Sequence, residues 1–305
     1  MRWIALLTAS AALLLGPTAS ANDSAAVTGA GGLVLTRNAQ IDMISEDLYV
    51  SAERVRVRYV FRNRSRRPVR LTVAFPMPDF DLSAFGEDDR GLLSDFSTRV
   101  DGRPVRMQVE RRAFARGVDH SALLRRLGIP FAGGATGYDA GPVSQALNRL
   151  LPAELARLEQ FGLVEGFTDG GRRSYDARWV VRETWHWDQV FPAGRDLVVE
   201  HSYAPGAGGT VSTAFGNPTI RDQDYVREGI RRYCIDRDFL AAAERLVGQP
   251  GVVNVSEQWL RYVLTTGGNW RAPIRDFRLV VDKGRPENLV SFCGAGVRRI
   301  SPTQF

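Results

Sequence analysis

The sequence predicts a mainly β protein, an immunoglobulin-like β-sandwich with a helical insertion and one further helix. Three observations favour this fold class. Apolar and polar side chains alternate over several short segments, these segments end at glycine- and proline-rich turns, and few stretches have the periodicity of a long helix. Such a pattern favours two packed sheets over a parallel α/β fold.

The N-terminal β half, residues 22–116, contains the clearest strand. In the run from Arg54 to Arg62, apolar side chains alternate with arginines, so one face of the strand is apolar and the other is charged. Further strands are expected at Leu33–Thr36, Ile41–Ile44, Leu48–Val50 and Val69–Phe75, and a hairpin of Phe96–Val100 and Val105–Val109 around the turn Asp101-Gly102.

Residues 117–166 have a helical periodicity and are predicted to form an insertion. Asp119 can cap a short helix, and a second helix is expected over Ala153–Phe161, before Gly162. The glycines of Gly133–Gly137 lie in the connecting loop. They lack the flanking strand and helix start of a phosphate-binding loop, so we predict a structural role for them.

The C-terminal β half, residues 167–305, is predicted to contain one helix, and the two halves are expected to form one unit. The helix carries the sequence FLAAAERLV, with Asp236 or Asp238 as its N-cap and Gly248 at its end. Strands are expected at Arg178–Phe191, Asp196–Ala204, Val252–Thr265, Phe277–Asp282 and Leu289–Phe292.

The first 21 residues predict export. Arg2, the apolar run Ile4–Leu15 and the small residues Ala19-Ser20-Ala21 have the order of a signal peptide that is cleaved after Ala21. The apolar run is about twelve residues long, shorter than the stretch of about twenty that spans a bilayer. We therefore expect a mature chain without a transmembrane segment, located in the periplasm of a Gram-negative cell.

The charge and the cysteines fit this compartment. The formal net charge is +6, and every basic residue except Lys283 is an arginine. Export argues against a nucleic-acid partner, so the positive charge favours an envelope protein or an anionic envelope component as the partner. Cys234 and Cys293 are the only cysteines. In an oxidising compartment the pair predicts one disulfide, with free structural thiols as the alternative.

Four arginines of the run from Arg54 are candidate anion contacts: Arg54, Arg56, Arg58 and Arg62. Alternate residues of a strand lie about 6.7 Å apart, within the screening length, so their fields add. Arg64, Arg66, Arg67 and Arg70 extend the cluster around the following turn. The alternative is pairing with Asp42, Glu46, Asp47 or Glu53 of a neighbouring segment, a solvated charge ladder of little energetic worth.

A second candidate site is polar and lies in Trp179–Tyr203, which we predict to be a hairpin. Matching its apolar faces sets His186 opposite Ser202 and Asp188 opposite Glu200, with His201 against Trp187 in the core. Facing carboxylates beside an imidazole could hold a cation or act as an acid/base pair. This is the basis of an alternative function, an envelope hydrolase or sugar-active enzyme.

Two other interpretations of this hairpin stay open. A slip of one residue would set His186 against His201, a possible two-histidine metal pair. The simplest interpretation is an ordinary charged strand face, with His201 bonded to a backbone carbonyl in the core.

Other motifs of catalysis are absent from the sequence. It contains no Gly-x-Ser-x-Gly, no His-Glu-x-x-His, no Walker loop and no Cys-x-x-Cys. We therefore expect no catalytic residues, no metal and no cofactor. The function that we predict is a non-enzymatic binding or interaction module of the cell envelope.

Several segments resemble an uncharacterised bacterial family, the domain of unknown function family forty-four twenty-four (DUF4424). They are Gly31–Ser51, Val55–Asn63, Val73–Asp79, Phe191–Pro205, Tyr233–Asp236 and Ser291–Phe305. The resemblance implies an exported protein, one family-wide unit of β type, and a cysteine pair at Cys234 and Cys293. It implies no activity, and it implies relatives that continue past Phe305.

Overall fold

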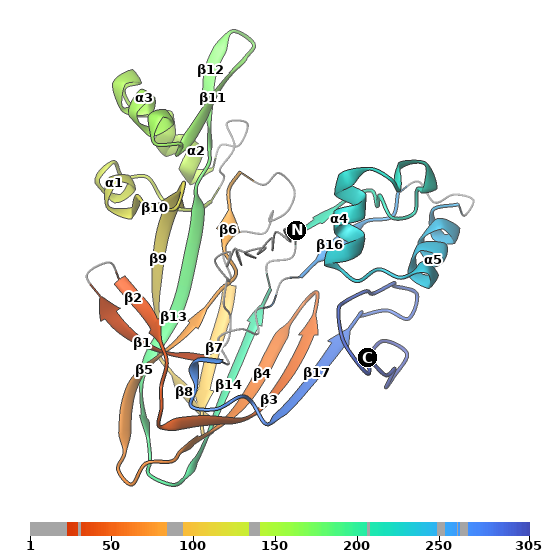
Figure 1. Ribbon diagram of the computed structural model, residues 1–305. Helices are drawn as coiled ribbons and strands as arrows, with labels where there is room; N and C mark the ends of the chain where they lie inside the picture. The colour runs from red at the N-terminus through yellow and green to blue at the C-terminus, as the bar shows by residue number, and fades with distance from the viewer. Residues whose placement is uncertain are drawn as a thin grey trace, which may run out of the picture.

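A computed structural model of the protein describes residues 23–29, 32–83, 94–133, 141–205, 208–248, 254–260, 262 and 268–305. Within these ranges the chain is mainly β, as the alternating sequence pattern predicts. Two large sheets form its body, and helices lie at their periphery (Figure 1).

The first sheet contains seven strands, and their pairing is antiparallel. In spatial order they are β10 (Val118–Asp119), β9 (Gln108–Ala115), β13 (Val180–Phe191), β5 (Val69–Pro76), β1 (Ser24–Gly29) and β2 (Gly32–Thr36), with β6 (Phe80–Asp81) paired to β13. The sequence pattern did not predict β1.

The second sheet contains six strands. In order they are β17 (Asp276–Asp282), β3 (Ile41–Ser51), β4 (Val55–Asn63), β14 (Asp196–Ala204), β7 (Ser94–Val100) and β8 (Arg103–Val105). Only β17 and β3 pair in parallel. The pairing of β7 with β8 confirms a hairpin around Asp101-Gly102, but its second strand is Arg103–Val105 instead of the predicted Val105–Val109, the end of which belongs to β9 of the first sheet.

The two sheets share one hydrophobic core. Val57, Tyr59 and Phe61 of β4 contribute to it from the second sheet, and Phe75 and Trp187 contribute from the first. These side chains are buried, whereas Arg56 and Arg58 between them are exposed. The alternation in the run from Arg54 is therefore confirmed, and each large apolar side chain buried in this way contributes about 1.5–3 kcal/mol.

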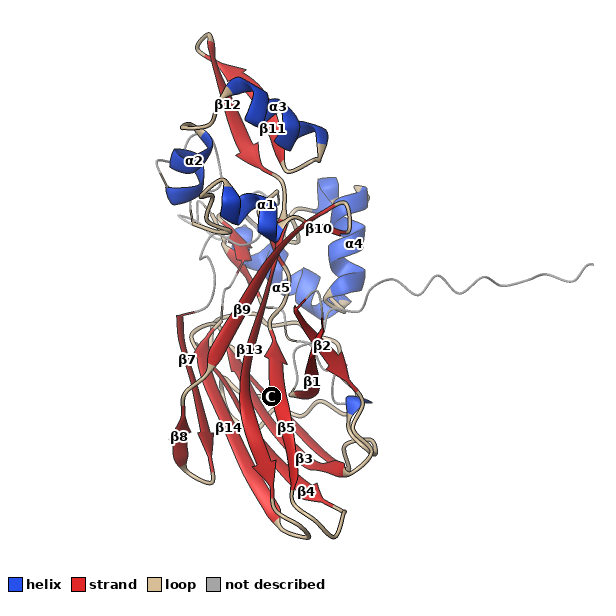
Figure 2. Ribbon diagram, turned by 90° about the vertical axis from the view of Figure 1, so that its left-hand side faces the viewer, coloured by secondary structure: helices blue, strands red, loops and turns tan. Residues whose placement is uncertain are grey.

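The predicted hairpin of Trp179–Tyr203 is wrong. Its two strands, β13 and β14, are consecutive, but β13 pairs with β5, β6 and β9, and β14 pairs with β4 and β7. Each strand has one apolar face, and these faces meet across the core instead of lying side by side. The connection from β4 to β5 also crosses from one sheet to the other. The β4–β5 turn and the β13–β14 turn lie at one end of the body (Figure 2).

Several predicted boundaries differ from the structure. The segments Ile41–Ile44 and Leu48–Val50 merge into the single strand β3, whose register shifts between Met43 and Ser45. Leu289–Phe292 is not a strand. Part of Val252–Thr265 lies outside the described residues, and its strand β16 (Glu257–Trp259) pairs with β15 (Gly208–Thr210).

The residues between β10 and β13 contain both predicted helices. They are α1 (Ser121–Arg126) and α3 (Pro152–Gln160), accompanied by the unpredicted helix α2 (Pro142–Leu147) and the hairpin of β11 (Val164–Asp169) and β12 (Arg172–Ala177). Asp119 accepts a hydrogen bond from the Ser121 backbone (2.8 Å) next to α1. Most of Gly133–Gly137 lies outside the described residues. These elements lie at the end of the body opposite the turns (Figure 2).

The C-terminal part adds a short 3₁₀ helix, η1 (Pro218–Ile220), and two helices, the unpredicted α4 (Asp224–Arg232) and the predicted α5 (Arg237–Val247). Asp236 is the N-cap of α5 and accepts a hydrogen bond from the Phe239 backbone at 2.7 Å. Cys234 and Cys293 form a disulfide, with Cα atoms 5.2 Å apart, which confirms that prediction.

Candidate functional site

The predicted arginine stripe lies on the outer face of β4, where acids flank it on both sides. Arg58 lies opposite Asp47 on β3 and Glu200 on β14, and Arg62 lies opposite Asp42 and Asp196. Arg62 Nε donates to Asp196 Oδ1 at 2.6 Å, and Arg58 Nε is 4.0 Å from Glu200 Oε1. The neighbouring strands therefore offset much of the positive charge.

The remaining two arginines of the stripe have different surroundings. The Arg56 guanidinium lies over the Tyr49 ring, 4.4 Å from its centroid, which is a cation–π contact. Arg54 makes no ion pair with a described residue. Acidic partners therefore offset the charge of Arg58 and Arg62, but not that of Arg54 and Arg56.

A further group of arginines lies at the end of the body where the β4–β5 and β13–β14 turns meet. Gly194 of the second turn donates its backbone N–H to the Asn63 carbonyl, at 3.1 Å. We call this region the arginine end. It combines eight arginines with two aspartates: Arg37, Arg62, Arg64, Arg66, Arg67, Arg70, Arg195, Arg271, Asp42 and Asp196.

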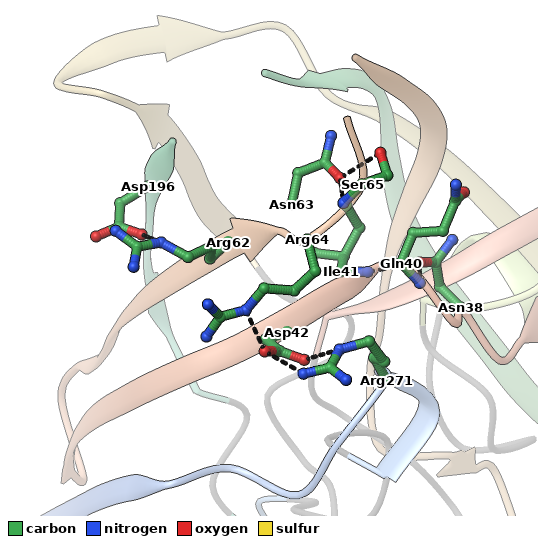
Figure 3. A network of polar contacts seen from close by, with 10 residues as sticks. All are labelled: Asn38, Gln40, Ile41, Asp42, Arg62, Asn63, Arg64, Ser65, Asp196 and Arg271. Atoms are coloured by element: carbon green, nitrogen blue, oxygen red, sulfur yellow. Dashed lines mark hydrogen bonds and ion pairs between the residues drawn. The ribbon is translucent and has the colours of Figure 1, made fainter. Parts of the chain in front are cut away.

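Asp42 is the centre of the arginine end (Figure 3). Its side chain is only 4% exposed, and its carboxylate accepts hydrogen bonds from Arg271 (2.6 and 2.8 Å) and from Arg64 (2.7 Å). The bond from Arg271, and then that from Arg64, lower the pKa of Asp42 although burial opposes them. Asp42 thus stays ionised and holds together segments that are 229 residues apart.

Asn63 holds the β4–β5 turn through its side chain, and Figure 3 shows its contact with Ser65. Its amide group donates to the carbonyls of Arg67 (2.8 Å) and Phe191 (2.9 Å), and its oxygen accepts from the Ser65 backbone and hydroxyl. Because the Asn63 side chain uses both its donor and its acceptor groups, it fixes the turn without help from the arginines. Arg66 and Arg67 consequently stay exposed.

Two shallow depressions hollow the arginine end. The first, about 450 Å³, is lined by Gln40, Ser65, Arg66, Arg67, Pro68 and Val69. The second, about 510 Å³, is lined by residues that include Arg37, Asn38, Trp270, Arg271, Pro273 and Ile274. Among the described residues that line the two depressions, none is acidic.

Three of the four arginines that line the depressions are available for a ligand. Arg37, Arg66 and Arg67 form no ion pair with any residue that the structure describes. A guanidinium group presents several N–H donors in a plane that matches phosphate and carboxylate oxygens. The arrangement is suited to binding an anion, and sequence reasoning anticipated Arg64, Arg66, Arg67 and Arg70 but not Arg37 or Arg271.

The candidate polar site is not assembled. His186 and Asp188 lie on β13 in the first sheet, whereas Glu200 lies on β14 in the second, and Asp188 accepts a hydrogen bond from Thr72 (2.9 Å). Glu200 lies opposite Arg58 and Arg99. The pair of His186 with His201 does not form either, since His201 faces the core.

His201 belongs to a buried polar chain that the sequence analysis missed. One imidazole nitrogen of His201 lies 3.1 Å from Asp23 Oδ1 and the other 2.8 Å from Thr98 Oγ1, and all three residues are buried. The expected bond to a backbone carbonyl is therefore replaced by side-chain partners. Contact with Trp187 does occur, with ring centroids 5.6 Å apart, across the two sheets.

The order of acid, imidazole and hydroxyl resembles a hydrolytic triad, but its burial points to a structural role. Burial raises the pKa of Asp23, which His201 opposes, and Asp23 Oδ2 has no hydrogen-bond partner among the described residues. Neither depression is lined by any of the three residues. The sequence did contain a signal for the contact between Thr98 and His201, because both residues occupy inward-facing positions in their strands.

Nearby, Tyr59 and Tyr262 share a hydrogen bond at 3.1 Å, and Tyr262 approaches Glu46 at 3.5 Å. Burial raises the pKa of both tyrosines well above the ordinary value, so they stay protonated as donors.

In the described ranges, no three His, Cys, Asp or Glu side chains gather to hold a metal. No helix there is long and apolar enough to cross a membrane.

A family model for a domain of unknown function, DUF4424, matches residues 21–305. The chain belongs to this family. The match covers almost all of the sequence, including both turns of the arginine end and the cysteine pair. The predicted resemblance is thereby confirmed. Curated proteins include no match to the chain.

The DUF4424 chain is also similar to a candidate nutrient binding protein from Legionella pneumophila, with 15% sequence identity and a TM-score of 0.38. That similarity covers 88% of this chain and 55% of the Legionella protein. This chain therefore spans little more than half of that protein's length.

Proposed function

We propose that this DUF4424 protein is a non-enzymatic binding module of the cell envelope that takes an anionic ligand at its arginine end. The observation that carries this proposal is the contrast between two arginine groups. Arg58 and Arg62 of the stripe lie between acids of both neighbouring strands, whereas Arg37, Arg66 and Arg67 line depressions and have no acidic partner among the described residues.

Electrostatics supports the choice of the arginine end over the stripe. The stripe places Asp47 and Glu200 beside Arg58, so an approaching anion meets repulsion as well as attraction. At the arginine end, the only two acids are already paired, Asp42 with Arg64 and Arg271 and Asp196 with Arg62. An anion there would contact arginines that need not give up a partner.

The proposed setting is the periplasm, reached through a signal peptide cleaved after Ala21. The order of charged, apolar and small residues before Asn22 supports it. In this setting an immunoglobulin-like sandwich would serve as a rigid scaffold that presents the arginine end. Cell fractionation together with N-terminal sequencing tests the location, and full-length protein that retains Met1 in the cytoplasm would contradict it.

Binding to vesicles of phosphatidylglycerol and phosphatidylcholine at low salt tests the ligand class. We expect binding that weakens as salt rises, since a Debye length falls to about 3 Å at 1 M. The double variant Arg66→Gln/Arg67→Gln is expected to bind about thirty-fold more weakly, at about 1 kcal/mol for each arginine.

The matched control is Arg56→Gln/Arg58→Gln, which removes the same charge from the stripe. We expect it to bind nearly as well as the unmodified protein. An equal loss in the two double variants would show that only the net charge matters. No binding of the unmodified protein at low salt would contradict an anionic ligand altogether.

A further inference from the structure

The two depressions of the arginine end lie on opposite sides of one short segment. Gln40 lines the first depression, and Asn38 and Ala39 line the second. Two residues of extended chain span at most about 7 Å. The linings of the two depressions are therefore adjacent along the chain, and we call the segment 38–40 the ridge.

The ridge is held in place by hydrogen bonds that leave the depressions open. Asn38 Oδ1 accepts from the backbone N–H groups of Gln40 (2.8 Å) and Ile41 (2.9 Å), which closes a tight turn before β3. On one flank Arg64 donates its backbone N–H to the Gln40 carbonyl at 2.8 Å, and on the other Asn38 donates to the Asn269 carbonyl at 2.8 Å. The ridge is thus fixed from both sides, and the spacing of the depressions is fixed with it.

Each depression has its own source of positive charge. Arg66 and Arg67 line the first, and Arg37 and Arg271 line the second. Arg271 already makes two hydrogen bonds to Asp42, which leaves Arg37 as the cation of the second depression without an acidic partner among the described residues. One anionic group can be bound on each side of the ridge.

Asp42 does not oppose a ligand with two anionic groups. Its side chain is almost fully buried beneath Arg64 and Arg271, and the side chains of both arginines remain more than a third exposed. The second depression also has an apolar wall that includes Trp270, Pro273 and Ile274. This wall suits a carbon skeleton that joins the two groups.

From these observations we infer that the ligand of the arginine end carries two phosphate groups on one skeleton, one bound by Arg66 and Arg67 and the other by Arg37. This inference rests on the proposed function and names its ligand class. Phosphate is favoured over carboxylate because one phosphate offers three acceptor oxygens, enough for two guanidinium groups. A phosphorylated glycolipid headgroup and a soluble sugar bisphosphate share this chemistry.

Calorimetric titration with ligands that differ in the number and the spacing of their phosphate groups tests the two-site geometry. The probes are fructose 1,6-bisphosphate, pyrophosphate, whose two phosphorus atoms share one oxygen and cannot span the ridge, and glucose 6-phosphate with a single group. We expect the bisphosphate to bind at least about thirty-fold more tightly than either control, because the second contact is intramolecular.

Variants on each side of the ridge make the test specific. Arg37→Gln and Arg66→Gln/Arg67→Gln are each expected to reduce the affinity for the bisphosphate to that for the monophosphate, whereas Arg56→Gln/Arg58→Gln leaves the difference intact. Thermal unfolding of each variant checks that it is folded. A bisphosphate that binds no better than pyrophosphate overturns the inference. The inference is also overturned if the bisphosphate still binds more tightly than the monophosphate in both Arg37→Gln and Arg66→Gln/Arg67→Gln.

The outcomes separate this inference from the proposed function. If vesicles bind through Arg66 and Arg67 but the bisphosphate has no advantage, the two-site ligand is wrong and the anion-binding module stands. If neither vesicles nor phosphates bind, both are wrong. Vesicles that contain a bisphosphorylated glycolipid, compared with its monophosphorylated form, distinguish the sources: a preference for the former with weak binding of the soluble sugar identifies a headgroup.

Discussion

Asp42 is a nearly buried acid whose two partners are arginines of the proposed binding surface, Arg64 and Arg271. Asp42→Asn should therefore have opposite effects on folding and on binding. The variant loses charge-assisted hydrogen bonds, and we expect its free energy of unfolding to fall by about 2 kcal/mol. It also releases two guanidinium groups, so anionic vesicles should bind more tightly. Urea unfolding and vesicle sedimentation measure the two effects.

The pH dependence of stability gives a control for this prediction. Because Arg271 and Arg64 lower the pKa of Asp42 in the folded state, its contribution is fully present above the pKa of the unfolded chain. The contribution is lost as pH falls through the folded pKa. The difference in stability between the unmodified protein and Asp42→Asn should shrink on acidification from pH 7. A difference that grows in acid would contradict the ion-pair assignment.

At the scale of residues, sequence reasoning found part of the site. Arg64, Arg66 and Arg67 follow directly on a recognisable strand, so their clustering is a local property. Arg37 and Arg271 join them only through contacts such as that between Arg271 and Asp42, which are distant in sequence. The acids beside the stripe were foreseen in Asp42 and Asp47 of β3, but not in Glu200 and Asp196 of β14.

At the scale of elements, Asn63 links the β4–β5 turn to the proposed site. It is buried, and its amide group bonds both its own turn and the carbonyl of Phe191 at the start of the other turn. Asn63→Ala removes the amide donor of both carbonyls and the acceptor of the Ser65 N–H, and leaves the Arg67 carbonyl with the Ser65 hydroxyl (2.8 Å), at an expected cost of about 2 kcal/mol. Because Arg66 and Arg67 lose their fixed positions, vesicle binding should weaken too.

A comparison with Arg67→Gln separates positioning from charge. Asn63→Ala keeps every arginine, so its binding loss should come with increased protease sensitivity of the 63–68 turn, whereas Arg67→Gln should weaken binding without that sensitivity. Unchanged binding in folded Asn63→Ala protein would show that the turn needs no fixed conformation.

Strand positions were predictable where the signal is local, but strand partners were not. Asp196–Ala204 was predicted with the bounds that the structure shows for β14, in which the buried residues Leu197, Val199, His201 and Tyr203 alternate with less buried ones. The predicted pairing of β14 with β13 was wrong. An apolar strand face can be buried beside a neighbouring strand of the same sheet or against a facing sheet. Periodicity within one strand does not distinguish these two solutions.

At the scale of the whole molecule, the described residues form three separate hydrophobic clusters. The first lies between the two sheets, the second contains Trp179 together with residues of α1, α2 and α3, and the third contains Phe215, Val226 and Ile235 around α4. The third has the fewest buried members. A cluster of that size leaves its segment dependent on additional constraints.

The disulfide supplies such a constraint, which leads to a prediction about where the molecule opens first. Cys234 follows α4, and Cys293 lies in the C-terminal segment, 59 residues away. Closing a loop of this length stabilises the folded state by about 4 kcal/mol in the chain-entropy model.

In Cys234→Ser/Cys293→Ser we therefore expect the region of α4 and α5 to unfold at lower temperature than the two-sheet core. Limited proteolysis at rising temperature should cut this region first and leave the sheets intact, because their cluster does not include it. Vesicle binding at the arginine end should persist after α4 and α5 have opened and until the two-sheet core unfolds, since Arg66 and Arg67 lie between β4 and β5. A single cooperative transition with simultaneous loss of both regions would instead mean that α4 and α5 are energetically part of the sandwich.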